Sequence, residues 1–448
     1  MNPFLDGRPK IAFYGDDFTG ATDSLATATL GGLRSLLFLR VPDAAQLRAA
    51  GRLDCLGIAG TARSMAPGPM HDELAPVSAF FSGLRAPVTH YKICSTFDSA
   101  PEVGNIGAAI RLLRARIANP FIPIVGGQPN LRRYCVFSQL YAAGQEGGEV
   151  FRIDRHPTMS RHPVTPMTEA DLRVHLLQQS LRVTGVHYPS YGNDERLAAE
   201  VDVALAGQPD ALLFDVSRED ELAGIGRLIW DRALRQPLLA VGASGVIQAL
   251  LAAWRSRQWL VPQPPPAAPI AAAQGPVLVL AGSLSPTTAR QVEAAHSYRK
   301  LVLDAGRLYA ADMHYRHVMA REITQLLGQG ISVLACTSAP HSGRVGEPDA
   351  AHRLARSGGE LLREILQLQP LRRVGVAGGD TSSHALRACE VWGLSYRGQL
   401  APGVALCRAH ADAAHLEGLE LMLKGGQMGG DDLFERLLHG SASGSAAA

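Results

Sequence analysis

Short apolar runs recur along this chain, and stretches with helical spacing lie between most of them. Strands that alternate with helices are typical of α/β proteins with mainly parallel sheets and flanking helices. The runs that we expect to form strands are 10–14, 35–39, 54–59, 88–94, 121–125, 211–216 and 238–241 in the first part, and 277–281, 300–304, 331–335 and 373–377 in the second. The sequence therefore predicts an α/β fold.

A proline-rich stretch separates these two series of runs. Residues 261–276 have the composition of a semi-rigid, extended spacer. The chain has 448 residues, more than one hydrophobic core usually serves. We therefore expect two domains, 1–260 and 277–440, each built on a mainly parallel sheet and joined by the linker 261–276. A flexible tail of small residues is expected at 441–448.

Composition narrows the class of protein. The formal net charge is only +2, from 43 basic and 41 acidic residues, which gives no support for a nucleic-acid or membrane partner. The longest apolar runs, such as 277–281, are too short to span a bilayer. The six cysteines are scattered and form no Cys-x-x-Cys pair, which is typical of reduced thiols in the cytoplasm and argues against a zinc site.

Two carboxylates follow the first apolar run. Residues 11–15 read as a buried strand, Asp16 and Asp17 come next, and helical spacing begins at once. In open α/β sheets chemistry takes place at the carboxyl ends of strands. Helix capping is the alternative, although one aspartate suffices for a cap. Asp23 lies four residues after Thr19 on the same helix face, so up to three carboxylates are expected near this strand end.

Basic and hydroxyl side chains follow two further strands of the first half. Arg63 comes after the run 55–59, and Lys92 with Ser95, Thr96 and Asp98 comes after 88–91. An arginine suits a two-pronged grip on a carboxylate, and the hydroxyl and carboxyl groups suit a small polyol. For each of these two cations taken alone, a surface salt bridge is the favoured explanation. Three such strand ends at one sheet edge favour a common pocket.

The second half has glycine- and hydroxyl-rich loops after its strands, at 282–288, 378–383 and 424–430. Such loops, placed before helices, let backbone N–H groups approach an anion. None matches a standard phosphate-binding fingerprint, so plain N-cap turns remain the alternative. A first half suited to hydroxyls and a second half suited to polyphosphate together indicate phosphoryl transfer across a cleft between domains.

The chain resembles the four-carbon acid sugar kinase family, the bacterial kinases of threonate, erythronate and 3-oxo-tetronate. The resemblance spans most of the chain and is carried by residues 15–23, 91–99, 162–167, 282–285 and 378–381. It implies an N-terminal domain that binds the sugar acid and a C-terminal domain that binds ATP. Two stretches, 125–134 and 424–429, depart from the family pattern.

The resemblance also implies roles for single residues. Asp16 and Asp17 would face the acceptor hydroxyl, and Asp17 is our preferred residue to orient that hydroxyl or accept its proton. The sugar-acid site would contain Arg63, Lys92, Ser95, Thr96 and Asp98. ATP would be held by Ser283, Gly378, Gly379, Asp380, Thr381, Ser382 and Gly425. Mg²⁺ is expected to accompany ATP, and no residue is assigned as a metal ligand.

The expected function is therefore that of a cytoplasmic, ATP-dependent kinase acting on a terminal hydroxyl of a four-carbon sugar acid in carbohydrate catabolism. Its partners would be the sugar acid and ATP, and a homodimer is an open possibility. Two alternatives stay open. One is an NAD-dependent oxidoreductase, which the missing Gly-x-Gly-x-x-Gly motif disfavours. The other is a non-catalytic sugar-acid sensor, suggested by the altered stretch 424–429. The polar loop 152–167, with His156 and His162, reads as either a lid or a surface loop.

Overall fold

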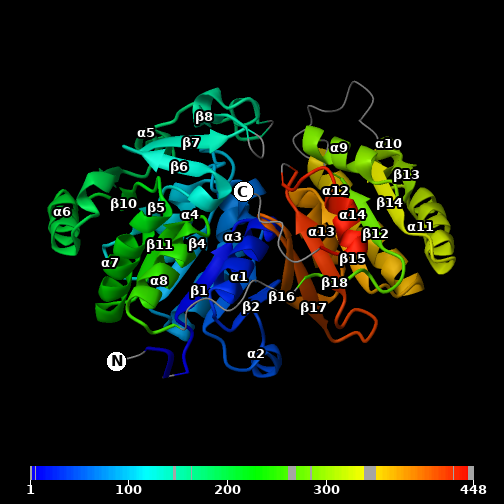
Figure 1. Cartoon of the computed structure of the whole chain (residues 1–448), viewed down its shortest axis with the longest axis horizontal. Coiled ribbons are helices and arrows are strands. Elements are labelled where there is room, and N and C mark those ends of the chain that lie inside the picture. The colour runs from blue at the N-terminus through cyan, green and yellow to red at the C-terminus, as the bar shows by residue number, and fades with distance from the viewer. Residues whose placement is uncertain are drawn as a thin grey trace. The chain divides into compact units, whose positions relative to one another are not determined.

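The computed structural model describes residues 3–5, 7–144, 148–162, 164–260, 269–282, 285–337, 350–426 and 428–441. The chain divides into two compact units (Figure 1). Unit 1 comprises residues 1–36 and 41–264, and unit 2 comprises residues 37–40 and 265–448. Ser283, residues 261–268 of the expected linker and residues 442–448 of the expected tail lie outside the described residues.

Unit 1 alternates strands and helices along most of its length. Its elements are β1 (Ile11–Gly15), α1 (Phe18–Leu30), α2 (Ala44–Ala50), β3 (Cys55–Ala59), α3 (Pro67–Leu84), β4 (Val88–Lys92), α4 (Ile106–Arg114), β5 (Pro123–Val125), β6 (Arg133–Val136), β7 (Gln139–Ala143), β8 (Val150–Arg152), α5 (Leu172–Leu177), β9 (Val183–Val186), α6 (Asp194–Ala206), β10 (Ala211–Phe214), α7 (Leu222–Arg235), β11 (Leu238–Gly242) and α8 (Gly245–Ser256). The strand β2 (Ser35–Phe38) starts in unit 1, and its last two residues belong to unit 2.

The main sheet of unit 1 is parallel, in the order β3-β1-β4-β11-β5-β10-β9. Every residue of β1, β3, β4 and β11 is buried, because helices cover a parallel sheet on both faces. This burial explains why β1, β3 and β11 read as continuous apolar runs. The register aligns Gly15 with Ala59 of β3 and with Lys92 of β4, so these three strands end at one level.

A small antiparallel sheet, β6-β7-β8, also belongs to unit 1, and the sequence did not predict it. It stands at the carboxyl edge of the main sheet, because Cys135 of β6 bridges to Val216, just after β10. The hairpin between β6 and β7 turns at Phe137 and Ser138, which have φ of 49° and 66°. The buried carboxylate of Asp215 accepts the N–H groups of both turn residues, at 2.8 and 2.9 Å.

Unit 2 contains β12 (Leu278–Ala281), α9 (Pro286–Ala294), β13 (Arg299–Leu303), α10 (Ala305–Tyr309), α11 (Met313–Gly328), β14 (Val333–Thr337), α12 (Ala350–Leu368), β15 (Arg373–Ala377), α13 (Gly379–Ala388), β16 (Val391–Ala401), β17 (Val404–Ala411), β18 (Glu420–Lys424) and α14 (Leu433–His439). Its strand order is β13-β14-β12-β15-β18-β17-β16. The first five strands are parallel and the last two are antiparallel additions.

The prediction of an α/β fold with two domains and mainly parallel sheets is confirmed. The long hairpin β16–β17 was not expected, nor was the strand β18. Leu37 and Phe38 pair with Leu394 and Gly393 of β16, so a segment from the first part of the chain completes the edge of unit 2. Residues 168–182 have helical spacing in the sequence, but α5 covers only Leu172–Leu177, because Asp171 caps its start and Ser180 adopts φ +58° beyond its end.

Candidate active site

Four charged residues from three neighbouring strand ends meet in unit 1. Asp16 and Asp17 follow β1, and Lys92 is the last residue of β4. Arg63 lies in a short 3-10 turn, η2 (Ala62–Ser64), after β3. The backbone joins these segments directly: Asp16 N donates to Lys92 O at 3.0 Å, and Arg63 N donates to Asp16 O at 3.0 Å. The sheet order β3-β1-β4 therefore brings together four of the residues expected at the site.

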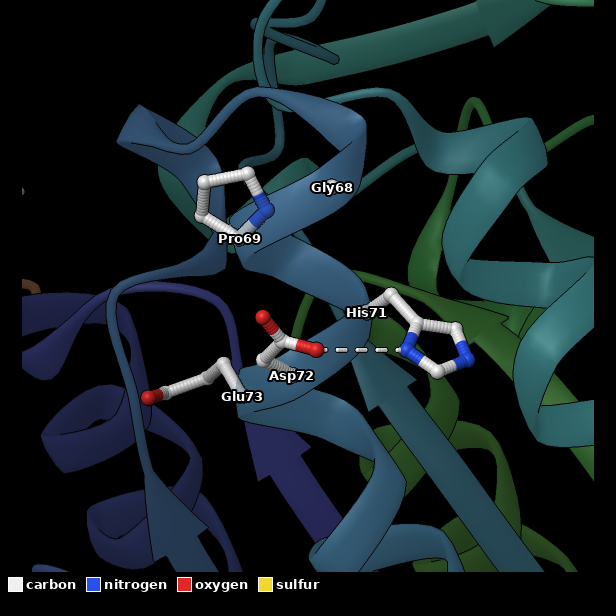
Figure 2. A pocket seen from close by; sticks show the side chains of 5 residues that line it. All are labelled: Gly68, Pro69, His71, Asp72 and Glu73. Carbon is white, nitrogen blue, oxygen red and sulfur yellow. Dashed lines mark ion pairs between the residues drawn. The ribbon is translucent and has the colours of Figure 1, made fainter.

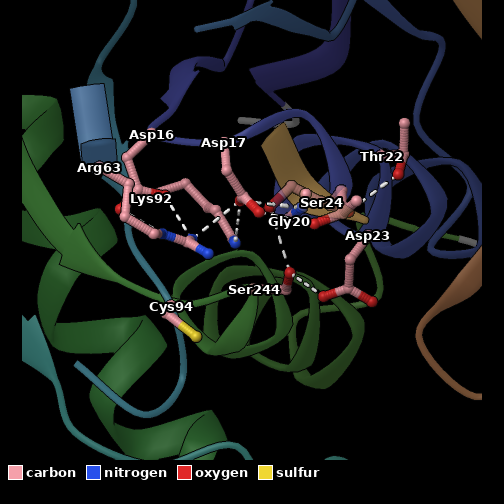
Figure 3. Close-up of polar contacts among 12 residues, drawn as sticks. Asp16, Asp17, Gly20, Thr22, Asp23, Ser24, Arg63, Lys92, Cys94 and Ser244 are labelled. Atoms are coloured by element: carbon pink, nitrogen blue, oxygen red, sulfur yellow. Dashed lines mark hydrogen bonds and ion pairs between the residues drawn. The ribbon is translucent and has the colours of Figure 1, made fainter. Parts of the chain in front are cut away.

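The guanidinium of Arg63 binds both aspartates (Figure 3). Its Nε and Nη2 donate to the two oxygens of Asp16, at 3.2 and 2.6 Å. The same Nη2 lies 2.8 Å from Asp17 Oδ1. These groups lie at a sheet edge with little solvent access, since the Asp16 side chain is 4% exposed and the Arg63 side chain 22%.

Lys92 supplies a second cation to Asp17. Its Nζ lies 3.7 Å from Asp17 Oδ1, and its side chain is 5% exposed. Gly20 in the first turn of α1 makes room for it, because a Cβ at Gly20 would lie 1.6 Å from Lys92 Nζ. Asp17 also caps α1 by accepting from Gly20 N at 3.0 Å, and its other oxygen accepts from Thr19 Oγ1 at 2.6 Å. Capping and charge pairing thus use the same carboxylate.

The surroundings push the pKa values of the two aspartates apart. Burial raises the pKa of Asp16, and Arg63 opposes this only in part while the charge of Asp17 adds to it. Burial also disfavours ionised Asp17, but Arg63, Lys92 and the bonds from Thr19 and Gly20 overcome it and lower the pKa of Asp17 to about 2. Asp17 is therefore the firmly ionised member of the pair, and two carboxylates with separated pKa values suit an acid–base site.

The loop after β4 carries the remaining polar residues expected in the sugar-acid site. Thr96 Oγ1 donates to Asp98 Oδ1 at 2.5 Å and lies 2.9 Å from Cys94 Sγ. Thr96 is buried, whereas Ser95 and Asp98 are partly exposed. Cys94 lies beside the charged cluster in Figure 3. The loop thus offers hydroxyl and carboxyl groups next to Lys92.

Asp23, the third carboxylate, has different hydrogen-bond partners from those of Asp16 and Asp17. Its Oδ2 accepts from Ser244 Oγ, just before α8 (Figure 3). The same oxygen accepts from Gln128 Nε2 at 3.4 Å. Ser244 also lies 3.1 Å from Ser24 Oγ. Gln128 and Ser244 follow β5 and β11, so they extend the polar row along the same edge of the sheet. Neither was predicted, although Gln128 lies in a stretch that departs from the family pattern.

In unit 2 the glycine-rich loops follow the neighbouring strands β12, β15 and β18. Gly282 N donates to Ala377 O, and Gly378 N donates to Lys424 O, so backbone bonds join the three strand ends. Gly378, the N-cap of α13, has φ +125°, which a side chain would strain. A Cβ at Gly282 would lie 2.3 Å from Thr381 Oγ1.

The structure thus brings most of the residues expected to hold ATP to one sheet edge. Gly379, Thr381 and Ser382 lie in the first turn of α13, and Gly425 follows β18 directly. The side chain of Asp380 lies outside the described part, as does Ser283.

Lys424 was not singled out as a site residue, yet it is fully buried. Its Nζ donates to Thr288 Oγ1 at 2.8 Å and to Gln291 Oε1 at 2.6 Å, both on α9. Burial lowers the pKa of Lys424 to about 7. Gln291 Nε2 in turn donates to the carbonyls of Met428, Gly429 and Gly430, each at 3.0 Å. Lys424 and Gln291 therefore tie the late glycine-rich loop to α9.

The histidines of the loop 152–167 have structural partners. His156 is buried, its Nε2 donates to Ala143 O, and its Nδ1 accepts from the N–H groups of Thr158 and Met159. His162 Nδ1 accepts from Thr165 N at 3.1 Å. Within the described ranges, no group of three or more His, Cys, Asp or Glu residues is placed to hold a metal ion. Across the same residues, no helix is both long and apolar enough to cross a membrane.

A surface pocket of about 740 Å³ lies at the start of α3, lined by Gly68, Pro69, His71, Asp72 and Glu73 (Figure 2). None of these is a residue expected at the site. Glu73 accepts from Tyr14 OH at 3.2 Å, which connects the pocket to β1. His71 Nδ1 lies 3.5 Å from Asp72 Oδ1, but the two side chains are 68% and 89% exposed, so this pocket lacks the burial of the Asp16–Arg63 cluster.

Two family models match the chain. The sugar-binding N-terminal domain matches residues 11–250, and the nucleotide-binding C-terminal domain matches residues 278–434. A 3-oxo-isoapionate kinase from Paraburkholderia graminis is 37% identical, with 97% of this chain and 95% of the relative covered. A 3-oxo-tetronate kinase from Cupriavidus necator is 30% identical, with 97% and 98% covered.

Among solved structures, a Salmonella typhimurium LT2 protein matches with a TM-score of 0.74 at 22% identity, covering 96% of this chain and 98% of that one. At this identity the likeness supports the fold alone. The family models and the full-length relatives also show the family, and they confirm the resemblance seen in the sequence. The chain belongs to the four-carbon acid sugar kinase family, with a sugar-binding N-terminal domain and a nucleotide-binding C-terminal domain.

Proposed function

We propose that this protein is an ATP-dependent kinase that transfers the γ-phosphoryl group to a hydroxyl of a 3-oxo sugar acid. The observation that carries the proposal is the full-length match to two relatives that are both named as kinases of 3-oxo acids. The same two names support a kinase over an NAD-dependent oxidoreductase or a non-catalytic sensor. The more similar relative makes 3-oxo-isoapionate the first substrate to test and 3-oxo-tetronate the second.

The charged cluster of unit 1 suits the acceptor side of this reaction. Phosphoryl transfer asks little covalent chemistry of the protein and depends on positioning and electrostatics. Asp17 stays ionised at any physiological pH, so its carboxylate can accept a hydrogen bond from the attacking hydroxyl and orient it. Asp16, whose pKa is raised, is the better proton acceptor of the two but is bound to Arg63 on both oxygens.

The loops of unit 2 suit the nucleotide side. The first N–H groups of α13 have no partner within the helix, and the N-cap residue Gly378 has φ +125° and offers no side-chain cap. We expect ATP to enter as its Mg²⁺ complex, with the metal bound mainly by phosphate oxygens and water. Transfer requires that the two substrates meet, so an active site in a cleft between the domains stays our prediction.

The test is an ADP-release assay with ATP–Mg²⁺ and a panel of acids that contains 3-oxo-isoapionate, 3-oxo-tetronate, threonate and erythronate. We expect turnover with a 3-oxo acid at a kcat/KM at least tenfold above that for threonate or erythronate. ADP release with none of the acids, from protein that binds ATP in a thermal-shift assay, would contradict the proposed function.

A further inference from the structure

Arg133, the first residue of β6, is a cation near the predicted sugar-acid site, and it forms no ion pair with an acidic side chain among the described residues. Its Nη1 donates to the main-chain carbonyls of Leu131 and Arg132, at 2.8 and 3.3 Å. Its Nε is buried and no described atom accepts a hydrogen bond from it. A buried donor without a partner is costly in a folded protein, and it calls for a ligand at that position.

The geometry of this side chain fits a carboxylate. Arginine grips a carboxylate with two parallel N–H groups, and the Nε–Nη2 edge is one of the edges that can do so. In Arg133 the two main-chain carbonyls bind Nη1, and no described atom accepts a hydrogen bond from the buried Nε. In Arg63 the same edge already binds the oxygens of Asp16. The cluster at β1 therefore has less capacity for a substrate carboxylate than Arg133 has.

The backbone fixes Arg133 at the carboxyl edge of the sheet. Arg133 and Gln128 exchange two main-chain hydrogen bonds, at 2.9 and 3.2 Å, and Gln128 follows β5. Arg133 also lies within electrostatic range of Cys94 and Asp98, which oppose the lowering of its pKa by burial. Arg63 lies within range of the same Cys94 thiol. Both guanidiniums are thus within electrostatic range of the loop after β4.

We propose that Arg133 binds the carboxylate of the sugar acid through its Nε and Nη2 atoms, an assignment that rests on the proposed kinase function. The acid's carboxylate is then held on the β6 side of the loop 94–98. Its hydroxyls extend toward Asp98, Thr96 and Lys92. The hydroxyl that is phosphorylated lies at the far end of the acid, next to Asp17.

The experiment compares the acid with a neutral analogue in which a hydroxymethyl group replaces the carboxylate. In Arg133→Gln we expect the KM for the acid to rise roughly 10- to 100-fold, which is the loss of a two-pronged, charge-assisted contact. The kcat should change less than about threefold, and the KM for the neutral analogue should stay the same. The preference of the wild type for the acid over the analogue therefore disappears in this variant.

Arg152→Gln is the matched control. Arg152 lies on β8 of the same small sheet, but its Nε and Nη2 already bind both oxygens of Asp154. This variant should keep the wild-type preference for the acid. Arg133→Lys keeps the positive charge but lacks the two parallel N–H donors of a guanidinium, so it should lose part of the preference for the acid over the analogue. If Arg133→Gln does not unfold cooperatively on heating, Arg133→Lys is compared with the wild type in its place.

The outcomes separate the two proposals. An Arg133→Gln variant that is folded and active, and that still prefers the acid as strongly as the wild type does, overturns the role of Arg133 and leaves the kinase function standing. A purely structural role for Arg133 would lower stability and raise both KM values alike, which also overturns the assignment. Absence of ADP release from the wild type with every acid would instead contradict the kinase function itself.

Discussion

Arg63 and Asp16 form a two-pronged ion pair in which Nε and Nη2 of the guanidinium donate to both carboxylate oxygens, at 3.2 and 2.6 Å. The pair joins the segment after β3 to the segment after β1, and the same Nη2 reaches Asp17. Arg63 thereby supplies positive charge that keeps two adjacent carboxylates together in a buried place. Its predicted role as a clamp for the substrate carboxylate stays a prediction, and the structure shows that most of its hydrogen-bonding edge is already in use.

Replacing Asp17 should separate catalysis from folding. Asp17→Asn keeps an oxygen that can accept from Gly20 N, so the cap of α1 survives. The substitution removes the negative charge that lies beside Lys92 and that we expect beside the substrate's acceptor hydroxyl. We expect kcat to fall by a factor of about 100 or more, with an unchanged far-UV circular dichroism spectrum. Asp43→Asn, at the exposed N-cap of α2, is the control and should keep full activity. Wild-type turnover in Asp17→Asn would remove Asp17 from the mechanism.

Gly20 should prove important for activity and not for stability. In Gly20→Ala the new Cβ would lie 1.6 Å from Lys92 Nζ and 2.5 Å from Asp17 Oδ1, so the flexible ends of both side chains would have to move. The helix itself would gain about 0.5–1 kcal/mol from losing a glycine. We therefore expect kcat/KM for the acid to fall about tenfold or more, the scale of losing one charge-assisted contact, with a thermal midpoint equal to or above that of the wild type. Gly83→Ala, at an open position in α3, should gain similar stability at unchanged kcat/KM. Equal activity of the two variants would rule out this role for Gly20.

Lys424 should make the stability of unit 2 depend on pH. Its pKa is about 7 when folded and 10.5 in the unfolded chain, so between these values the unfolded chain binds a proton that the folded chain lacks. Stability must then rise with pH, by up to about 1.4 kcal/mol for each unit. We expect the unfolding free energy of the wild type, measured against that of Lys424→Met, to increase from pH 7 to pH 10.

The exposed Lys300→Met variant controls for the loss of one lysine in that comparison. A difference between wild type and Lys424→Met that stays constant from pH 7 to pH 10 would show that Lys424 does not lose its charge. Lys424→Met also loses the hydrogen bonds to Thr288 and Gln291. This loss lowers its unfolding free energy by the same amount at every pH and does not change the slope against pH.

Asp215 should be essential for the small sheet that carries Arg133. Asp215→Ala leaves the N–H groups of Phe137 and Ser138 without their acceptor, in a turn where both residues have positive φ. We expect a loss of about 3 kcal/mol in chemical denaturation. Adding Ser138→Gly should recover about 1 kcal/mol of it, because glycine adopts this φ without strain. A loss below about 0.5 kcal/mol would show that the hairpin holds its turn without Asp215.

The polar row at the sheet edge of unit 1 could be predicted only in part. Asp16 and Asp17 were found because they follow a run that is apolar on both faces, as a buried parallel strand is. Lys92 was found because it ends the strand-like run that starts at Val88. Asp23 was expected beside them, but the direction of its side chain depends on Ser244, which is 221 residues away. Arg133 gave no signal, since its importance lies in a missing partner, and partners are a property of the folded chain.

The sequence by itself determined the α/β class, the positions of most parallel strands and the family, because these depend on local apolar runs and on motifs of a few residues. Only the tertiary structure decided that β3, β1 and β4 are neighbours, and thus that Arg63 meets Asp16. It also decided the burial of Lys424 and the pairing of Leu37 and Phe38 with β16. These features arise from contacts between segments that are far apart in the chain, and each segment taken alone is compatible with many partners.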